Sequence, residues 1–257
     1  MTQPLQVHQF PCRKDNYGFL VHDAESGLTA VVDTPEVAPI EKALAETGWK
    51  LTHILNTHHH NDHAGGNLEL KASTGCTVIG PRADADRIPG IDEGVGDGDV
   101  VELGTHRARV YDTPGHTRGH ICFHFEDDGI AFVGDTLFAL GCGRLFEGTP
   151  AQMWNSLSKF NTWPDDTRVY CAHEYTQANA RFALPVEPDN RAPVDRAADI
   201  DGLCANGTPT VPTTMGLERA TNPFLRPDSV DLQRTIGLEG ADVVEVFAKT
   251  RELKDAF

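Results

Sequence analysis

The 257-residue sequence predicts an α+β fold in which clusters of strands alternate with helices. Short apolar runs bounded by Gly, Pro or Asp are typical of strands, and ten of them lie at about residues 5–11, 17–22, 28–33, 51–56, 77–80, 99–103, 108–112, 120–125, 130–134 and 167–172. Helical spacing of apolar residues occurs at about residues 36–47, 64–74 and 151–160. A hydrophobic content of 39% is enough for a proper core. Several mixed α/β architectures fit this order of elements.

The sequence changes in character after Glu174. The strand-like runs stop, and prolines interrupt the pattern at positions 185, 188, 193, 209, 212, 223 and 227. We therefore expect a domain boundary near residue 174, followed by a smaller helical domain. Its last expected helix runs from about Ala241 to Lys254, with candidate buried positions at Val243, Val244, Phe247 and Leu253.

Composition and charge limit the kinds of partner that the protein can have. The formal net charge of −16 argues against a nucleic-acid surface, which needs clustered Lys and Arg. The sequence shows neither a signal peptide nor an apolar stretch long enough to span a membrane. The six cysteines are scattered without C-x-x-C spacing, which favours a reduced compartment over a disulfide framework. We expect a cytoplasmic protein that binds neither nucleic acid nor membrane.

The most informative segment is residues 57–63, Thr-His-His-His-Asn-Asp-His. Side chains at i and i+2 of an extended backbone point the same way, so His58 and His60 can bind one ion together. Asp62 and His63 face a neighbouring position, which suggests a second ion. Two alternatives remain open from this segment alone: a surface tract that binds metal adventitiously, or an Asp N-cap among solvated imidazoles.

Three further apolar strands each end in a ligand-type residue, namely His116, Asp135 and His173. Three or four protein ligands satisfy one ion, whereas seven candidates fit two ions that share a carboxylate. Asp135 is the natural bridge, because a carboxylate has two oxygens and an imidazole has one available nitrogen.

Four motifs, T-H-x-H-x-D-H, P-G-H-T, G-D-T-L-F and A-H-E-Y-T, resemble those of the metallo-β-lactamase superfamily. Further stretches make the chain similar, over nearly its whole length, to one family within it, glyoxalase II or hydroxyacylglutathione hydrolase: residues 15–17, 141–148, 221–224 and 251–255. The resemblance implies a four-layer αββα sandwich with metal ligands on loops at one edge. It also implies a metal-binding catalytic domain at residues 1–174 and an α-helical, glutathione-binding domain at residues 175–257.

Two divalent ions per chain are expected, and we assign their ligands as His58, His60 and His116 for the first and Asp62, His63 and His173 for the second, bridged by Asp135. We expect zinc, although imidazole–carboxylate sites also accept iron or manganese. The chain has no G-x-S-x-G elbow and no H-E-x-x-H helix, so the nucleophile must come from the metals. Asp62 and Asp135 would hold a bridging hydroxide that attacks a thioester carbon.

By resemblance the substrate is S-D-lactoylglutathione and the products are D-lactate and glutathione, the last step of methylglyoxal detoxification. A lyase that forms the thioester would be the functional partner. The resemblance assigns substrate contacts to Arg144, Phe146, His173, Tyr175, Arg251 and Lys254. Arg144 stands where many members have Lys, and both side chains can meet an anion, though not interchangeably. Phe146 stands where some members have Tyr, so a hydroxyl contact with glutathione is lost there, which concerns affinity and not the reaction.

The pair Arg251 and Lys254 has two readings. The two residues share a helix face, and in glyoxalase II this R-x-x-K pair binds the glycine carboxylate of glutathione. Cations in the last turn of a helix are also favoured by its dipole whatever the function. From spacing alone both readings stay open.

Three other side chains are expected to have supporting roles. His59 points away from the first ion and packs outside the ligand set. His120 supports the neighbouring strand, and Asp33 could orient a ligand imidazole, as carboxylates behind metal ligands often do.

Two alternative functions are compatible with parts of this pattern. A glutathione persulfide dioxygenase with mononuclear iron shares His58, His116 and Asp135, but the helical domain with Arg251 and Lys254 argues against it. A non-catalytic metal-binding protein with the same fold would not need the complete ligand set.

Overall fold

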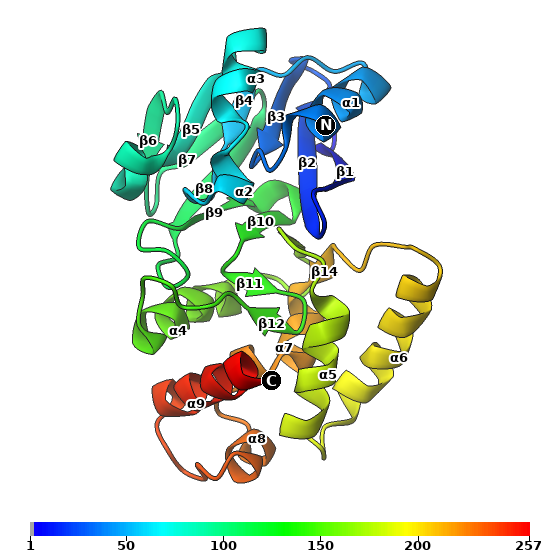
Figure 1. The fold of residues 1–257 in the computed structure, drawn as a ribbon, viewed down its shortest axis with the longest axis vertical. Helices are drawn as coiled ribbons and strands as arrows, with labels where there is room; N and C mark the ends of the chain where they lie inside the picture. Colours follow the sequence, from blue (N-terminus) through cyan, green and yellow to red (C-terminus); the bar gives the residue numbers. More distant parts are fainter. Residues whose placement is uncertain (1–2) are drawn as a thin grey trace. The chain divides into compact units, whose positions relative to one another are not determined.

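The computed structural model describes residues 3–257, which form two compact units (Figure 1). The first unit contains the described residues up to Asp112 together with Arg118–Gly134. The second unit contains Thr113–Thr117 together with Asp135–Phe257. The domain boundary that the sequence suggests near residue 174 stays a prediction.

A six-stranded sheet forms one layer of the first unit, in the order β1-β2-β3-β4-β5-β6. Pairing is antiparallel from β1 to β3 and parallel from β3 to β6. The strands are β1 Gln6–Cys12, β2 Asn16–Asp23, β3 Leu28–Val32, β4 His53–Leu55, β5 Thr77–Pro81 and β6 Glu93–Val95. Helices cover this sheet because the apolar stripe of α1 (Val37–Thr47) and Leu70 of α3 (Asn67–Thr74) pack with Leu20, Val31, Ile54 and Val78 in one buried cluster.

A second layer of the first unit is antiparallel throughout, in the order β10-β9-β8-β7. Its strands are β7 Val100–Leu103, β8 His106–Asp112, β9 Ile121–Phe125 and β10 Ile130–Gly134. Every residue of β9 and β10 is buried, as expected for strands covered on both faces. The rings of Phe19 in β2 and Phe132 in β10 lie 5.5 Å apart, so the two layers pack face to face as a sandwich.

The second unit is mostly helical. A small hairpin, β11 (Leu137–Phe138) and β12 (Gly141–Cys142), and the pair β13 (Arg168–Cys171) and β14 (Thr213–Thr214) are its strands. Its helices are α4 Pro150–Lys159, α5 Thr176–Val186, α6 Arg191–Ala205, α7 Met215–Thr221, α8 Val230–Thr235 and α9 Val243–Ala256. Helix α4 begins with a complete capping box between Thr149 and Gln152, which fixes its first residue.

The helices and strands predicted from periodicity are all present, but one predicted helix is divided and several short strands were not predicted. The helix expected at 64–74 is two helices, α2 (Asn61–Ala64) and α3, because Gly65 and Gly66 separate them. The short strands β6, β11, β12 and β14 were not predicted, since two or three residues carry no periodic signal. No helix in the described part of the chain is long and apolar enough to cross a membrane.

Candidate metal centre

Four candidate ligands of the first unit lie on the loop after β4 and on α2. Nε2 of His58 and Nδ1 of His60 are 3.1 Å apart, so the two imidazoles converge on one point, as their i, i+2 spacing predicted. Asp62 and His63 lie on α2, where Nε2 of His63 is 3.7 Å from Oδ2 of Asp62. The run therefore offers two pairs of donor atoms, each suited to sharing an ion.

Asp33 orients two of these imidazoles. Its Oδ2 accepts hydrogen bonds from Nδ1 of His63 and Oγ1 of Thr57, both at 2.8 Å. Because the Thr57 hydroxyl donates to Asp33, its lone pairs face Nδ1 of His58, 3.0 Å away. With both Nδ1 atoms in these bonds, both Nε2 atoms are left to face a metal ion, which is the tautomer that such outer carboxylates select in metal sites.

The backbone of Asp33 is held in an unusual conformation. Its φ is 58°, in the left-handed region that non-glycine residues rarely adopt, and its side chain is buried. Such strain persists where the surroundings fix it, commonly at functional sites. The contact expected between Asp33 and the imidazole of a candidate ligand is present, and it extends through Thr57 to a second candidate ligand.

Three candidate ligands of the second unit follow strand ends. The two carboxylate oxygens of Asp135 are divided: Oδ2 is 3.4 Å from Nε2 of His116, and Oδ1 is 3.4 Å from Nε2 of His173. Nδ1 of His116 lies 2.9 Å from the carbonyl oxygen of Arg144, which directs Nε2 towards Asp135. This division between two imidazoles is what a bridging carboxylate requires.

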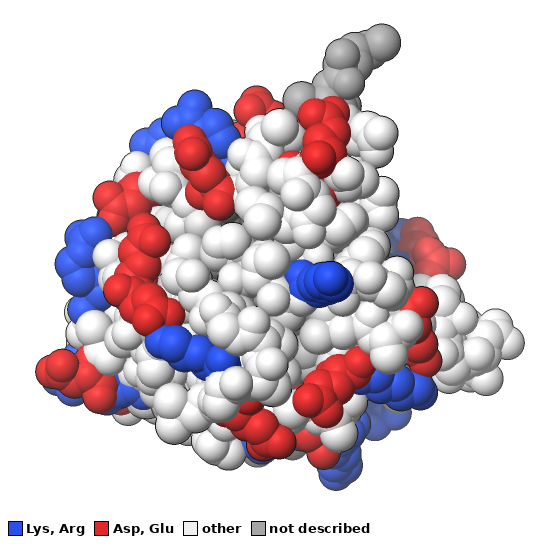
Figure 2. Space-filling view, turned by 90° about the horizontal axis from the view of Figure 1, so that it is seen from above, with Lys and Arg blue, Asp and Glu red and all other residues white. Residues whose placement is uncertain are grey.

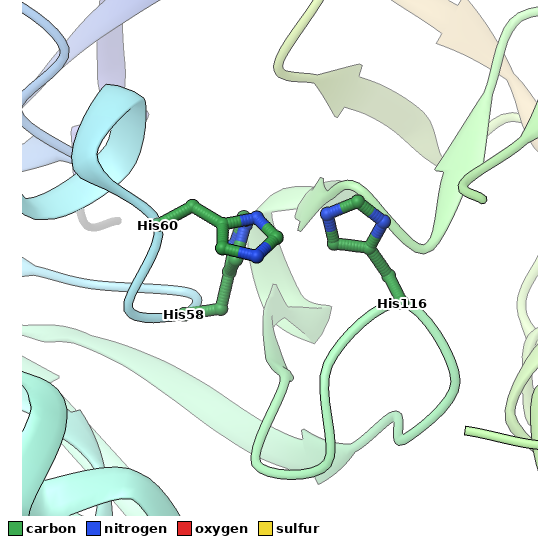
Figure 3. Close-up of side chains that lie close together, drawn as sticks. All are labelled: His58, His60 and His116. Atoms are coloured by element: carbon green, nitrogen blue, oxygen red, sulfur yellow. The ribbon is translucent and has the colours of Figure 1, made fainter. Parts of the chain in front are cut away.

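The described ligand-type side chains form three groups of three, and within each group the donor atoms lie within 4.8 Å of one another. The groups are His58, His60 and His116; His58, His63 and Asp135; and Asp62, His63 and His173. Figure 3 shows the imidazoles of the first group and the two loops that carry them. Together the groups contain all seven predicted ligands. Imidazole and carboxylate donors, mostly buried, suit divalent transition-metal ions, so the donor set fits the expected metals.

Aromatic rings flank both imidazoles of the second unit. The ring of Tyr175 stacks on His173 with a centroid separation of 4.8 Å and an interplanar angle of 1°. The ring of Phe146 lies 5.1 Å from that of His116. Both aromatic residues are exposed, at 37% and 62% respectively, so a bound molecule can reach them beside the candidate ligands.

The cations assigned to substrate binding differ in exposure. Arg144 is largely exposed, and Lys254 is half-buried with its Nζ donating to the carbonyl oxygen of Ala178 at 3.1 Å. Burial, with the charges of Arg251 and Arg144, lowers the pKa of Lys254 to about 8. Arg251 is buried, and its Nη1 donates to the carbonyl oxygen of Cys142. Substrate contacts for these residues stay predictions.

Two contributors to the site were missed by the sequence reasoning. Thr57 precedes the histidine run, and its hydroxyl was not singled out. Asn16, in a stretch noted only for resemblance, donates its Nδ2 to the backbone and side-chain oxygens of Asp62 at 3.3 and 3.5 Å. The position of Thr57 directly before His58 is a signal that could have found it, whereas Asn16 is 46 residues from Asp62 and has no such signal in the sequence.

His59 has the supporting contacts expected of it, whereas His120, expected to support the neighbouring strand, also contacts a candidate ligand directly. His59 lies between Oδ2 of Asp84, 3.3 Å from its Nδ1, and Nη1 of Arg87, 3.2 Å from its Nε2. His120 is fully buried and stacks on the ring of His58 at 4.8 Å. Both therefore pack behind the candidate ligands.

Comparison with known proteins identifies the superfamily to which this chain belongs. Residues 19–173 match the metallo-β-lactamase superfamily, and residues 174–257 match the family described as hydroxyacylglutathione hydrolase C-terminus. The ETHE1 structure from Myxococcus xanthus is similar with a TM-score of 0.70 at 25% identity, covering 96% of this chain and 90% of that one. A di-iron-bound structure, TTHA1623, shares the fold with a TM-score of 0.62 at 22% identity, covering 86% of this chain and all of that one. Fold and donor set together are those of a metallo-β-lactamase superfamily enzyme.

Relatives over the full length narrow the class to one family. The chain is 58% identical to hydroxyacylglutathione hydrolase of Maricaulis maris, covering 98% of this chain and 99% of the relative. It is 54% identical to that of Methylococcus capsulatus, with the same coverage. The chain belongs to the hydroxyacylglutathione hydrolase family, so the family and the fold class predicted from the sequence are confirmed.

Proposed function

We propose that this enzyme hydrolyses S-2-hydroxyacylglutathione thioesters, S-D-lactoylglutathione above all, to the hydroxy acid and glutathione. The observation that carries the proposal is the Asp135 carboxylate divided between two imidazoles, in a chain whose full-length relatives bear the name of that activity. A mononuclear centre would not need a carboxylate in that arrangement.

The seven candidate ligands would hold two divalent ions, with His58, His60 and His116 on one, Asp62, His63 and His173 on the other, and Asp135 on both. Such ions lower the pKa of bound water and polarise an acyl oxygen. Zinc is the proposed metal, and the same donors accept iron or manganese. Asp33 and Thr57 would hold two of the imidazoles in the ligating tautomer.

Residues of the second unit would bind the glutathione moiety. Lys254 and Arg144 supply positive charge for its carboxylates, which a protein of net charge −16 must concentrate locally. The exposed rings of Tyr175 and Phe146 would cover the acyl group and exclude water beside His173 and His116. The leaving thiolate is stable near neutral pH, so no side chain has to protonate it.

Cysteine side chains near the site do not supply an alternative nucleophile. Burial raises the pKa of the Cys142 thiol to about 11 and that of the Cys171 thiol to about 12. Nucleophilic cysteines have a lowered pKa, since the thiolate is the reactive form. Both thiols are therefore protonated at neutral pH, which agrees with a reaction that uses water.

The wider setting belongs to the same proposal. We place the enzyme in the cytoplasm, as the last step of methylglyoxal removal, after a lyase that forms the thioester. None of the six cysteines, all within the described residues, forms a disulfide, which agrees with a reducing compartment. On the face in Figure 2, Lys and Arg stand among Asp and Glu and form no extended basic surface there, in keeping with a small-molecule substrate.

The test follows the loss of thioester ultraviolet absorbance when the metal-loaded enzyme meets S-D-lactoylglutathione, with and without a chelator. Oxygen uptake on glutathione persulfide is followed in parallel. We expect rapid hydrolysis that the chelator abolishes and that added metal restores, without oxygen uptake. Oxygen consumption with an intact thioester would overturn the proposal in favour of the dioxygenase.

A further inference from the structure

The hairpin β11–β12 connects two parts of the candidate centre. Asp135 lies two residues before β11, and Arg144, whose carbonyl oxygen faces Nδ1 of His116, lies two residues after β12. The turn at Ala139 and Leu140 is tight, and Leu140 has a φ of 58°. A displacement of this hairpin would therefore move the bridging carboxylate and the support of one ligand imidazole together.

Four side chains from the helical region bind the backbone of this hairpin at five consecutive residues. Nδ2 of Asn222 donates to the carbonyl oxygens of Phe138 and Gly141 at 3.1 and 3.0 Å. Nδ2 of Asn179 donates to the carbonyl oxygen of Ala139 at 3.0 Å. Oε2 of Glu218 accepts from the backbone amide of Leu140 at 2.9 Å. Nη1 of Arg251 donates to the carbonyl oxygen of Cys142 at 2.9 Å. We call Asn179, Glu218, Asn222 and Arg251 the hairpin clamp.

The hairpin clamp is buried and its charges are compensated. Each of the four side chains belongs to a residue at most 5% exposed, where an unmade hydrogen bond is costly. Glu218 is paired with the guanidinium of Arg196, and Nη2 of Arg251 lies 2.9 Å from Oδ1 of Asp255. These ion pairs compensate the buried charges of Glu218 and Arg251, so the clamp residues belong to one buried polar network.

The glycines of the Gly-Cys-Gly motif fit the same arrangement. A Cβ on Gly141 would lie 2.5 Å from Nδ2 of Asn179, and one on Gly143 would lie 2.0 Å from the carbonyl oxygen of Asp135. Neither position has room for a side chain. The motif is therefore explained by the close approach of the hairpin to the clamp and to the bridging residue, apart from any contact with substrate.

We propose that the hairpin clamp consists of positioning residues, which act through the hairpin to fix Asp135 and the carbonyl oxygen of Arg144 for metal retention and turnover. Arg251 takes part through Cys142, in addition to any role of its charge. This inference rests on the proposed metal-dependent thioesterase function, because that function is what makes the placement of Asp135 matter.

The test uses Asn222→Asp and Asn179→Asp, which keep side-chain size but replace the donating amide with an oxygen that repels the hairpin carbonyls. Asn206→Asp is the matched control: its Nδ2 donates to the carbonyl oxygen of Gly202 at the end of α6. Each variant is titrated with a chelator while bound metal is measured, and kcat and KM for S-D-lactoylglutathione are determined on the reloaded enzyme.

We expect both clamp variants to lose metal at about tenfold lower chelator concentration and to lose about tenfold in kcat, as for other residues behind metal ligands, with KM nearly unchanged. Asn206→Asp should match the wild type. Wild-type metal retention and kcat in folded clamp variants would overturn the inference, as would an equal loss in the control. If Asn222→Asp does not fold, the outcome for Asn179→Asp decides the inference, because that variant removes only one hydrogen bond to the hairpin. A wild-type enzyme that does not hydrolyse the thioester would refute the proposed function. The comparison of metal retention between the clamp variants and the wild type would still test the role of the clamp.

Discussion

The two units supply their candidate ligands in different ways. In the first unit, four ligands come from six consecutive residues, and one carboxylate, Asp33, orients two of them. In the second unit, three ligands follow three separate strands, and a backbone carbonyl and a clamped hairpin support them. In the first unit one distant carboxylate is enough to orient two neighbouring candidate ligands, whereas the dispersed candidate ligands of the second unit depend on the packing of several elements.

The largest effect should come from the residue that the second unit places between two imidazoles. Asp135→Ala removes both oxygens of the proposed bridge, so we expect bound metal to fall below two ions per chain and kcat to fall by more than about 100-fold. Metal analysis and thioester kinetics on the same sample measure this. Asp127→Ala, an exposed residue, is the control, and full metal content with an unchanged rate would exclude the bridging role.

A smaller effect should come from the support in the first unit. Asp33→Asn weakens the orientation of both His58 and His63, and we expect a loss of about 10- to 100-fold in kcat. Thr57→Val removes only the link to His58 and should cost less. Kinetics and chelator titration of both variants measure the order. A larger loss in Thr57→Val than in Asp33→Asn would contradict the proposed role of Asp33.

The pH dependence of substrate affinity should reflect the second unit alone. Because the pKa of Lys254 is lowered to about 8, its positive charge is present below that pH and lost above it. KM for S-D-lactoylglutathione should therefore rise as pH increases from 7 to 9, by about fivefold for a contact of about 1 kcal/mol. Lys254→Arg keeps its charge and should flatten the rise. If KM of the Lys254→Arg variant rises equally between pH 7 and 9, deprotonation of Lys254 is not the cause of the pH dependence.

The smallest effect should come from the histidine inside the run that is not a ligand. His59 is held by Asp84 and Arg87, so His59→Ala should cost about 1 kcal/mol of stability and change kcat by less than about twofold. Thermal unfolding and kinetics measure the two quantities. Loss of an ion in His59→Ala would show that the first unit supplies five ligands.

The class of chemistry and most of the secondary-structure elements could be predicted from the sequence. Residues 57–63 predict metal binding because four candidate ligands lie within one short run. The long strands and helices could be predicted because their periodicity is set by local geometry. The motifs that extend to the last helix identified the family. Short strands such as β11 and β12 could not be predicted, since two residues carry no period.

The side chains that support the candidate ligands could be found only in the folded chain. Asp33 is 24 residues from Thr57 and 30 from His63, and Asn222 is 84 residues from the carbonyl of Phe138 that it holds. No local pattern marks an Asn or a Glu as a hydrogen-bond partner for a distant backbone, because that role depends on where the folded chain buries it. The sequence therefore predicts which side chains bind metal, and the folded chain decides how they are oriented.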